Sequence, residues 1–298
     1  MVTGPAPRVG AVLRLLGVVI AVVVLLPAWA APASAHAGGL ASSPSEARVL
    51  AVEPAVPGLE VRAVEFGARL RLDNGTGAAV VVEPLPGSVL SGLPGAAPGE
   101  TVRWADPRVL AAAQERPPGD RAAWAVPLRV GGAAVVVRGE QVWPPAPSPL
   151  WWLVALGALA VTAAAALPRR WGGAALAAGT LAVLAAHLVH VLGSALVPED
   201  QPYPVMLLSA AGYALLGWPL GIAGARLAVR GHPVGPLLCV AAGGLFAVVI
   251  APVDAFTLVD AVVPFAWGAD LDRLLVALTL GGGLGVVVAG VALMRRAA

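Results

Sequence analysis

Charged residues in the second half of the chain fall at alternating ends of long apolar runs. Arginines mark one set of ends and acids mark the other. The arginines are Arg169, Arg170, Arg226, Arg230, Arg295 and Arg296, and the acids are Glu199, Asp200, Asp254, Asp260, Asp270 and Asp272. Because arginine-rich ends stay in the cytoplasm, this alternation predicts an integral membrane protein with a defined orientation.

The composition agrees with a membrane protein and excludes several other classes. Hydrophobic residues make up 58% of the 298 residues and charged residues only 12%, which is far more apolar than a soluble domain. No basic stripe interleaved with aromatic residues is present, so we expect the lipid bilayer and not a nucleic acid as partner. The single cysteine, Cys239, excludes a disulfide framework.

Residues 1–35 have the three parts of a secretory signal peptide. Arg8 and Arg14 supply the positive region, residues 15–26 the apolar core, and the sequence at 33–35 (Ala-Ser-Ala) the small-residue cleavage site. Cleavage would make His36 the first mature residue. If the segment is not cleaved, it anchors the chain and the following residues are still exported.

Residues 36–142 are predicted to form an extracytoplasmic all-β domain, an immunoglobulin-like sandwich. Short runs alternate between apolar and polar residues, and Gly-rich pairs lie between them. The predicted strands are 59–63, 68–73, 78–82, 101–104, 123–130 and 133–141. Asn74-Gly75 and Gly131-Gly132 are typical of hairpin turns, and Trp104 and Trp124 are expected in the core. The Pro-rich residues 143–149 read as a stiff linker.

Residues 150–298 are predicted to form an α-helical bundle of about five transmembrane helices. The predicted spans are 149–167, 173–196, 204–225, 234–253 and 271–294, each near the twenty residues that a bilayer requires. The first span starts outside the cell, so the C-terminus is cytoplasmic. Arg273 is the exception to the charge pattern, and we expect it to pair locally with Asp270 and Asp272. Gly281 and Gly285 predict close helix packing, and the broken apolar stretch 255–268 is either an interfacial helix or a re-entrant piece.

His187 and His190 in the second predicted span are the main candidates for chemistry. Their spacing places both imidazoles on one helical face, and ionisable groups inside a membrane are candidates for function because they are costly to bury. From the rise of a helix, Ser209 and Tyr213 on the next span lie at a depth where they could orient the rings. Two interpretations stay open: a neutral cross-link between helices, or a site for a metal, a haem or a proton.

His36 is the second candidate, because a free amine and an imidazole on one residue can chelate Cu(II). The exported domain has no other His, no Met and no Cys. Carboxylates such as Glu46, Glu53 or Glu65, or a second protein, would have to complete a copper site. Alternatively, His36 only follows the cleavage site on a disordered end.

The start of the mature chain resembles that of a known family. His36-Ala37 followed by Ser42-Ser43-Pro44 resembles the opening of CopC-type copper-binding domains, small β-sandwiches that are fused or coupled to CopD-type membrane proteins. The overall layout also resembles actinobacterial membrane proteins with an exported β domain. The resemblance implies copper as a ligand and carries over only His36, since the further histidines or methionines of the CopC pattern are missing.

These patterns favour a multi-pass protein of the cell membrane that presents a binding or interaction module outside. It would assist copper or other metal handling, with a metal ion or an extracytoplasmic protein as partner. The alternative is a small transporter or channel, with His187, His190, Tyr213 and Asp254 along a path in the outer half of the bundle. We expect no enzyme, because no nucleophile–base pair or full ligand set is visible.

Overall fold

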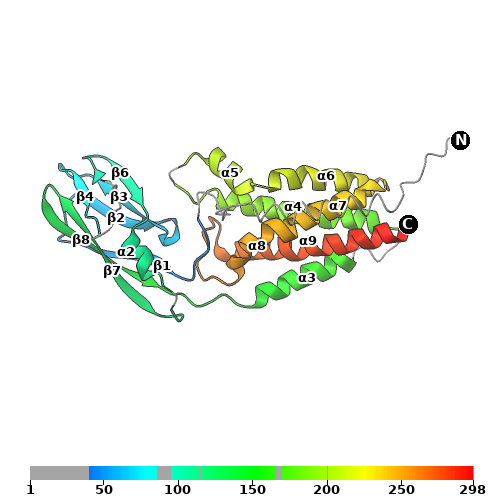
Figure 1. Cartoon of the computed structure of the whole chain (residues 1–298), viewed down its shortest axis with the longest axis horizontal. Coiled ribbons are helices and arrows are strands. Elements are labelled where there is room, and N and C mark those ends of the chain that lie inside the picture. The colour runs from blue at the N-terminus through cyan, green and yellow to red at the C-terminus, as the bar shows by residue number, and fades with distance from the viewer. Residues whose placement is uncertain (1–39, 86–94, 115, 165–169, 200, 298) are drawn as a thin grey trace. The chain divides into compact units, whose positions relative to one another are not determined.

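The computed structural model describes residues 40–85, 95–114, 116–164, 170–199 and 201–297, and the chain forms two compact units (Figure 1). The β unit consists of Ser42–Pro147 and Asp260–Pro264. The helical unit contains Ser148–Val259 and Phe265–Ala298. The predicted signal peptide and His36 lie outside the described residues.

The β unit contains two antiparallel sheets. One has five strands in the order β1-β8-β7-β4-β5, and the other has three in the order β2-β3-β6. The first sheet comprises β1 (Glu46–Glu53), β8 (Ala133–Val142), β7 (Arg121–Val130), β4 (Val80–Val82) and β5 (Gly95–Ala96). The second comprises β2 (Leu59–Val64), β3 (Arg69–Asn74) and β6 (Thr101–Trp104). The predicted strands are confirmed, whereas β1 and β5 were not predicted.

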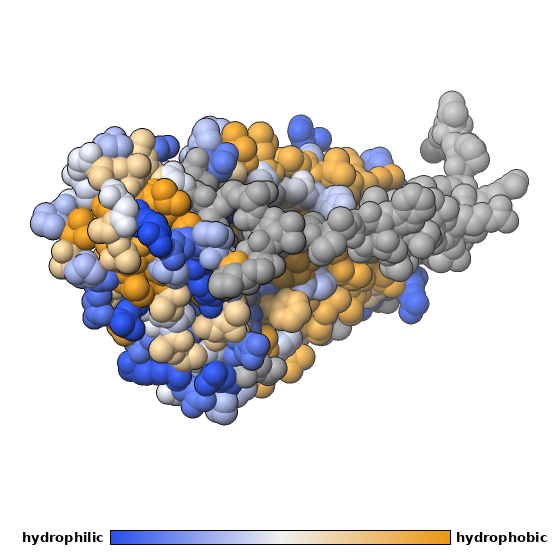
Figure 2. Space-filling view, turned by 60° about the vertical axis from the view of Figure 1, so that its left-hand side comes forward, coloured by the Kyte–Doolittle hydropathy of each residue, from blue (hydrophilic) through white to orange (hydrophobic). Residues whose placement is uncertain are grey.

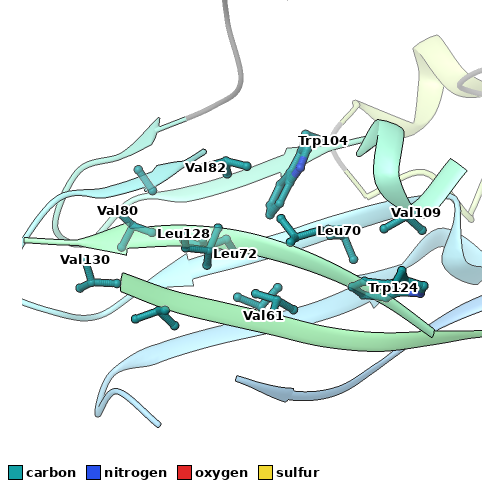
Figure 3. Close-up of a cluster of buried hydrophobic side chains, with 14 of the residues drawn as sticks. Val61, Leu70, Leu72, Val80, Val82, Trp104, Val109, Trp124, Leu128 and Val130 are labelled. Atoms are coloured by element: carbon teal, nitrogen blue, oxygen red, sulfur yellow. The ribbon is translucent and has the colours of Figure 1, made fainter. Parts of the chain in front are cut away.

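Alternating side chains from both sheets meet in one hydrophobic core (Figure 3). Leu70 and Leu72 of β3 point inward while Arg69, Arg71 and Asp73 lie on the other side of the strand, as the alternation predicts. Val126 and Leu128 of β7 enter the same core from the five-stranded sheet. Trp104 and Trp124 are buried there, which confirms the prediction for both tryptophans.

The two predicted turns have different roles. Gly131 and Gly132 have φ of 56° and 91° and close the hairpin between β7 and β8, as predicted. Asn74-Gly75 does not close a hairpin, because β3 and β4 belong to different sheets. The buried Asn74 amide donates hydrogen bonds to the carbonyls of Ala78 and Ala96, at 2.9 Å each, and so guides the chain from one sheet to the other.

A short helix, α2 (Pro107–Ala112), follows β6 and is fixed by a buried carboxylate. Asp106 caps the helix by accepting from the Arg108 backbone N–H at 2.9 Å. Its carboxylate also accepts from the Trp104 indole N–H at 3.0 Å and from the Arg108 guanidinium at 2.7 Å. Burial alone would raise the pKa of Asp106, but the hydrogen bonds from Arg108 and Trp104 outweigh it and hold that pKa below 3.8.

The helical unit consists of apolar helices, with a bend inside one predicted span and a π-helical turn inside another. Its elements are α3 (Leu150–Ala164), α4 (Gly172–Ser194), α5 (Tyr203–Ala211), α6 (Ala214–Val229), α7 (Val234–Gly244), the π-helical turn η3 (Leu245–Ile250), α8 (Ala251–Asp254), the 3-10 turn η4 (Ala255–Leu258) and α9 (Ala269–Ala297). Exposed apolar side chains cover much of its visible surface, as expected for contact with lipid (Figure 2).

Three helices are long and apolar enough to cross a membrane: Gly172–Ser194, Val234–Leu258 and Ala269–Ala297. The helical unit therefore indicates a membrane protein. The predicted span 204–225 is not one straight helix, because α5 and α6 meet at a bend of 67°. Gly212, with φ of 42°, lies at this bend. If the bent pair counts as one span there are four, and α3 is a shorter apolar helix.

The segment 255–268, predicted as an interfacial helix or a re-entrant piece, has only the 3-10 turn η4 as its helical part. Residues 259–264 contain no helix, and Val262 forms an isolated antiparallel bridge with Ser43 through two backbone hydrogen bonds of 2.9 Å. Ser42 Oγ also donates to Asp260 Oδ2 at 2.6 Å. Residues 260–264 are thereby part of the β unit.

The helix α9 packs against its neighbours through glycines. A Cβ atom at Gly281 would overlap the carbonyl oxygen of Ala155 in α3, and one at Gly285 would overlap Thr162 of the same helix. A Cβ at Gly283 would lie 2.9 Å from the carbonyl oxygen of Gly243. The predicted close packing at Gly281 and Gly285 is confirmed, and α3 is the neighbour.

Replacing Gly281 by alanine is expected to destabilise the helical unit by about 1–3 kcal/mol, because the added methyl group must push α9 away from α3. Thermal unfolding of the purified protein in lipid nanodiscs measures this. Gly157→Ala is the matched control: nothing lies within 4 Å of a Cβ at that exposed position of α3. It should leave stability unchanged or raise it by up to about 1 kcal/mol. Equal effects of both changes would contradict the close contact.

Asp106→Asn is expected to destabilise the β unit by about 1–3 kcal/mol, because charge-assisted hydrogen bonds to Arg108 are lost. The folded-state pKa lies below the ordinary value of 3.8, so this stabilisation is present above that value and disappears as the pH falls through the lower folded-state pKa. Hydrogen exchange of the peptides that span β6, α2 and β7 in the full chain measures the effect at neutral pH and at successively lower pH, where the difference between wild type and variant should shrink.

Asp73→Asn serves as the control for Asp106→Asn. The pKa of Asp73 is also lowered, chiefly by the hydrogen bond from Thr101, but this group lies at the surface. Solvent screens its interactions, so the change should cost less than about 1 kcal/mol. A larger loss at Asp73 than at Asp106 would overturn the role assigned to the buried carboxylate.

Candidate functional site: a buried histidine–carboxylate cluster

His190 of α4 faces two carboxylates that belong to two other helical segments. Its Nδ1 lies 2.6 Å from Oδ1 of Asp272, in the first turn of α9. Its Nε2 lies 3.5 Å from Oδ2 of Asp254, the last residue of α8. The sequence positions are far apart, so only the packing of α4, α8 and α9 brings these three side chains together.

The cluster is shielded from its surroundings. His190 is 4% exposed and Asp272 is 1% exposed. The ring of Phe265 stacks on the His190 ring, with 6.2 Å between centroids and 8° between planes. Phe265 in turn lies directly on Gly193, where a Cβ atom would overlap the phenyl ring. Gly193 therefore provides the space in which Phe265 covers His190.

His187 lies one helical turn from His190 and in a different environment. Its ring centroid is 5.8 Å from that of His190, 5.8 Å from that of Trp218 and 4.9 Å from that of Phe246. Within the described part of the chain, Nδ1 of His187 has no hydrogen-bond partner. The two histidines thus share a helical face, as predicted, but one contacts carboxylates and the other contacts aromatic rings.

The π-helical turn η3 explains how one helix supplies both Phe246 and Asp254. Eight residues separate them, which in a regular α-helix would place them about 80° apart around the axis. A π turn takes up an extra residue, so the separation corresponds to about seven α-helical residues and an offset of only about 20°. Both side chains can therefore face α4.

The geometry of the ring nitrogens suits the protonated imidazole. A neutral imidazole has one N–H donor, whereas an imidazolium has two. Both nitrogens of His190 face carboxylate oxygens, which accept hydrogen bonds when ionised. Two ionised carboxylates with a neutral ring would also leave uncompensated charge in a low-dielectric interior, which is costly. The cluster can therefore hold a proton on His190 between Asp272 and Asp254.

The space inside the cluster is narrow. It is too small for a water molecule and is lined by His187, His190, Ala251, Asp254, Val276 and Thr279. In the described ranges, no group of three or more His, Cys, Asp or Glu side chains is arranged to hold a metal ion. Oδ2 of Asp272 has no hydrogen-bond partner among the described residues. This oxygen is an acceptor that a proton could occupy.

The residues predicted from the sequence have different outcomes. His187, His190 and Asp254 come together, as described above. Ser209 and Tyr213 are both exposed, and the buried partners of His190 are carboxylates instead of these hydroxyls. The depth estimate assumed one straight third span, and the bend between α5 and α6 removes that assumption.

Asp272 and Phe265 were not predicted as site residues. Asp272 was assigned only to the outer end of a span, yet helical periodicity carries a signal for it: Thr279 and Gly283 lie 7 and 11 residues further on and are buried on the same face of α9. Asp270, two residues earlier, is exposed and pairs with Arg273 at 3.1 Å, as expected. No periodicity marks Phe265, because it precedes the helix.

Comparisons with known protein families, with curated proteins and with solved structures give no match.

Replacing His190 by leucine is expected to destabilise the helical unit by about 3–5 kcal/mol, because two carboxylates lose the group between them. Adding Asp272→Leu should restore part of the loss, since an apolar pair replaces an uncompensated buried charge. Denaturant unfolding in detergent micelles measures both variants. A double variant less stable than the single one would show that shape and not charge is decisive, and the exposed His232→Gln change should stay within about 0.5 kcal/mol of wild type.

Proposed function

We propose that the chain is a multi-pass protein of the cytoplasmic membrane that binds and releases protons in the outer half of its helical unit, as the proton site of a small transporter. The observation that carries this proposal is the contact of His190 with two buried carboxylates from two other helical segments. Ionisable groups inside a membrane are expensive to maintain and mark proton relays and ion pathways.

The short distance between His190 and Asp272 supports proton exchange within the cluster. A proton on Nδ1 can pass to Oδ1 of Asp272 across 2.6 Å, which converts an imidazolium and a carboxylate into a neutral imidazole and a carboxylic acid. The charge of the pair is the same before and after. This transfer therefore avoids the cost of separating charge in the apolar interior.

Irregular helices in the unit that holds the cluster also support a transporter. Discontinuous helices form substrate and ion sites in many transporters, and π turns occur frequently at functional sites. Here the bend between α5 and α6 and the π turn η3 belong to elements that pack with α4. A cross-link that served only stability would not require either interruption.

The proposed topology has five crossings, with the C-terminus in the cytoplasm. α5 and α6 together count as one broken span, and α3 counts as one crossing. The charge pattern supports this orientation: Arg226 and Arg230 would face the cytoplasm, as would Arg295 and Arg296 at the other cytoplasmic end. The exposed rings of Trp152 and Trp267 would lie at the outer interface.

The β unit in this proposal is an immunoglobulin-like module, exported by the signal segment 1–35, that binds a protein partner or a metal ion outside the cell. A role in copper handling rests on His36 and on the resemblance to CopC-type domains. It is tested by metal titration of the mature protein against His36→Ala and against His187→Ala/His190→Ala. Binding unchanged by either variant would remove the metal hypothesis.

The proton proposal is tested in proteoliposomes with a pH-sensitive dye inside. Under an imposed pH gradient, His190→Gln and Asp272→Asn should each lower the proton flux by about a hundredfold or more, because a positioned proton acceptor is lost. His232→Gln is the matched control: it removes an exposed histidine and should leave the flux unchanged.

Two results would overturn the proposal. A flux in His190→Gln equal to that of wild type would exclude the cluster from the path. No flux in wild type across a range of pH and candidate solutes, with the cluster intact, would leave it as a cross-link between helices.

A further inference from the structure

Arg273, which follows Asp272 in α9, is a buried cation with two contacts that differ in kind. The residue is 6% exposed, although arginine is among the residue types least often buried. Its Nη1 pairs with Asp270 at 3.1 Å, and the Asp270 side chain is 82% exposed. Its Nε donates a buried hydrogen bond of 3.0 Å to the backbone carbonyl of Thr257. The first contact faces outward, and the second fixes another segment of the chain.

The segment that Arg273 holds is the one that carries Asp254. α8 and η4 run without interruption from Ala251 to Leu258, so Thr257 lies about one turn beyond Asp254. The last carbonyls of a helical segment have no partner within the segment, and an orphaned carbonyl is costly away from water. Thr257 is fully buried. The guanidinium of Arg273 therefore satisfies this carbonyl and ties the end of the segment to α9.

Two consecutive residues of α9 thus shape the surroundings of the His190 ring. Asp272 contacts His190 directly, and Arg273 holds the turn that brings Asp254 to the other side of the same ring. A shift of this turn would change the 3.5 Å distance between His190 and Asp254 before it changed the 2.6 Å distance to Asp272.

The ionisable groups in contact with His190 are Asp254, Asp272 and the neighbouring His187. Arg273 pairs with Asp270 at 3.1 Å, and Asp270 lies in solvent, where its charge is screened. The link from Arg273 to the cluster is therefore the hydrogen bond to Thr257.

We propose that Arg273 is a positioning residue of the proton site: it holds the Asp254-bearing turn against α9, so that Asp254 stays beside His190. This inference rests on the proposed proton-binding function of the cluster. Arg273 acts through Asp254 and His190 and is not itself a proton carrier, because guanidinium groups stay charged in proteins.

Loss of the bond from Arg273 to Thr257 is expected to let the turn, and Asp254 with it, move away from His190. A nearby carboxylate favours the protonated imidazole. Arg273→Gln should therefore shift the protonation midpoint of His190 to a pH about one unit lower, a tenfold loss of proton affinity. Arg273→Lys also lacks the Nε donor, so it should loosen the turn and shift the midpoint in the same direction.

Nitrogen chemical shifts of labelled histidine side chains, recorded on the full chain in nanodiscs from pH 4 to 10, measure this directly. His190 is assigned by its loss in His190→Gln. Asp270→Asn is the matched control, because it removes the exposed partner of Arg273 and leaves the bond to Thr257. The protonation midpoint of His190 in this variant should stay within about 0.3 pH units of wild type. Hydrogen exchange at 254–259 should rise in both Arg273 variants and not in Asp270→Asn.

A midpoint and an exchange rate at 254–259 that stay at wild-type values in folded Arg273→Lys would overturn the proposal. If Arg273→Gln does not fold, Arg273→Lys alone decides, since its exchange rate tests the positioning. The readout does not require flux. A shifted His190 midpoint without any flux in proteoliposomes would refute the transporter and keep the positioning role of Arg273. Flux with unshifted His190 midpoints in the Arg273 variants would keep the transporter and refute the role of Arg273.

Discussion

The close approach of α9 to its neighbours is the constraint on which the helical unit depends. Glycines at 281, 283 and 285 let backbone contact backbone, and a side chain at any of these positions would separate the helices. Small residues of this kind are how helices associate in lipid, where apolar surfaces gain little by leaving the surrounding acyl chains. Because α9 lies this close to α3, α4 and α7, the first turn of α9 carries Asp272 directly onto His190.

The same packing decides which charges can be buried. A charged side chain in an apolar interior is tolerated only with a partner. The buried partners here come from other segments: His190 for Asp272, and the backbone carbonyl of Thr257 for Arg273. Each polar group thereby fixes one neighbour of α9. The cluster consequently cross-links the helices, and the proposed proton site would place the same demand on geometry.

Much of the architecture follows from the sequence, because periodicity and composition are local properties. Alternation correctly predicts strands such as β3 and β7, and the Gly131-Gly132 hairpin follows from the need for positive φ. β1 was missed, because its pairing partner β8 is about ninety residues away. The bend at Gly212 was missed for a related reason: hydropathy reports that 204–225 is apolar and contains no information on whether the helix is straight.

The site was half predicted. His187 and His190 are recognisable because polar residues are rare in an apolar run, and Asp254 was named with them. Asp272 was read as a boundary residue, since an acid at the end of a span is ordinary, and only the register of α9 distinguishes it from Asp270. Phe265 lies in an irregular segment, so its position over His190 depends on the tertiary fold alone.

The π turn η3 is a place where the chain can lose one residue without misdirecting its side chains. A wide turn absorbs one residue without changing which faces the flanking helices present. A polypeptide one residue shorter between 245 and 250 could close this turn into an ordinary α-helical one and still direct the phenyl ring at 246 and the carboxylate of α8 toward α4. Loss of a single residue is therefore geometrically neutral at this point, whereas in α9 it would rotate Asp272 away from the imidazole by about 100°.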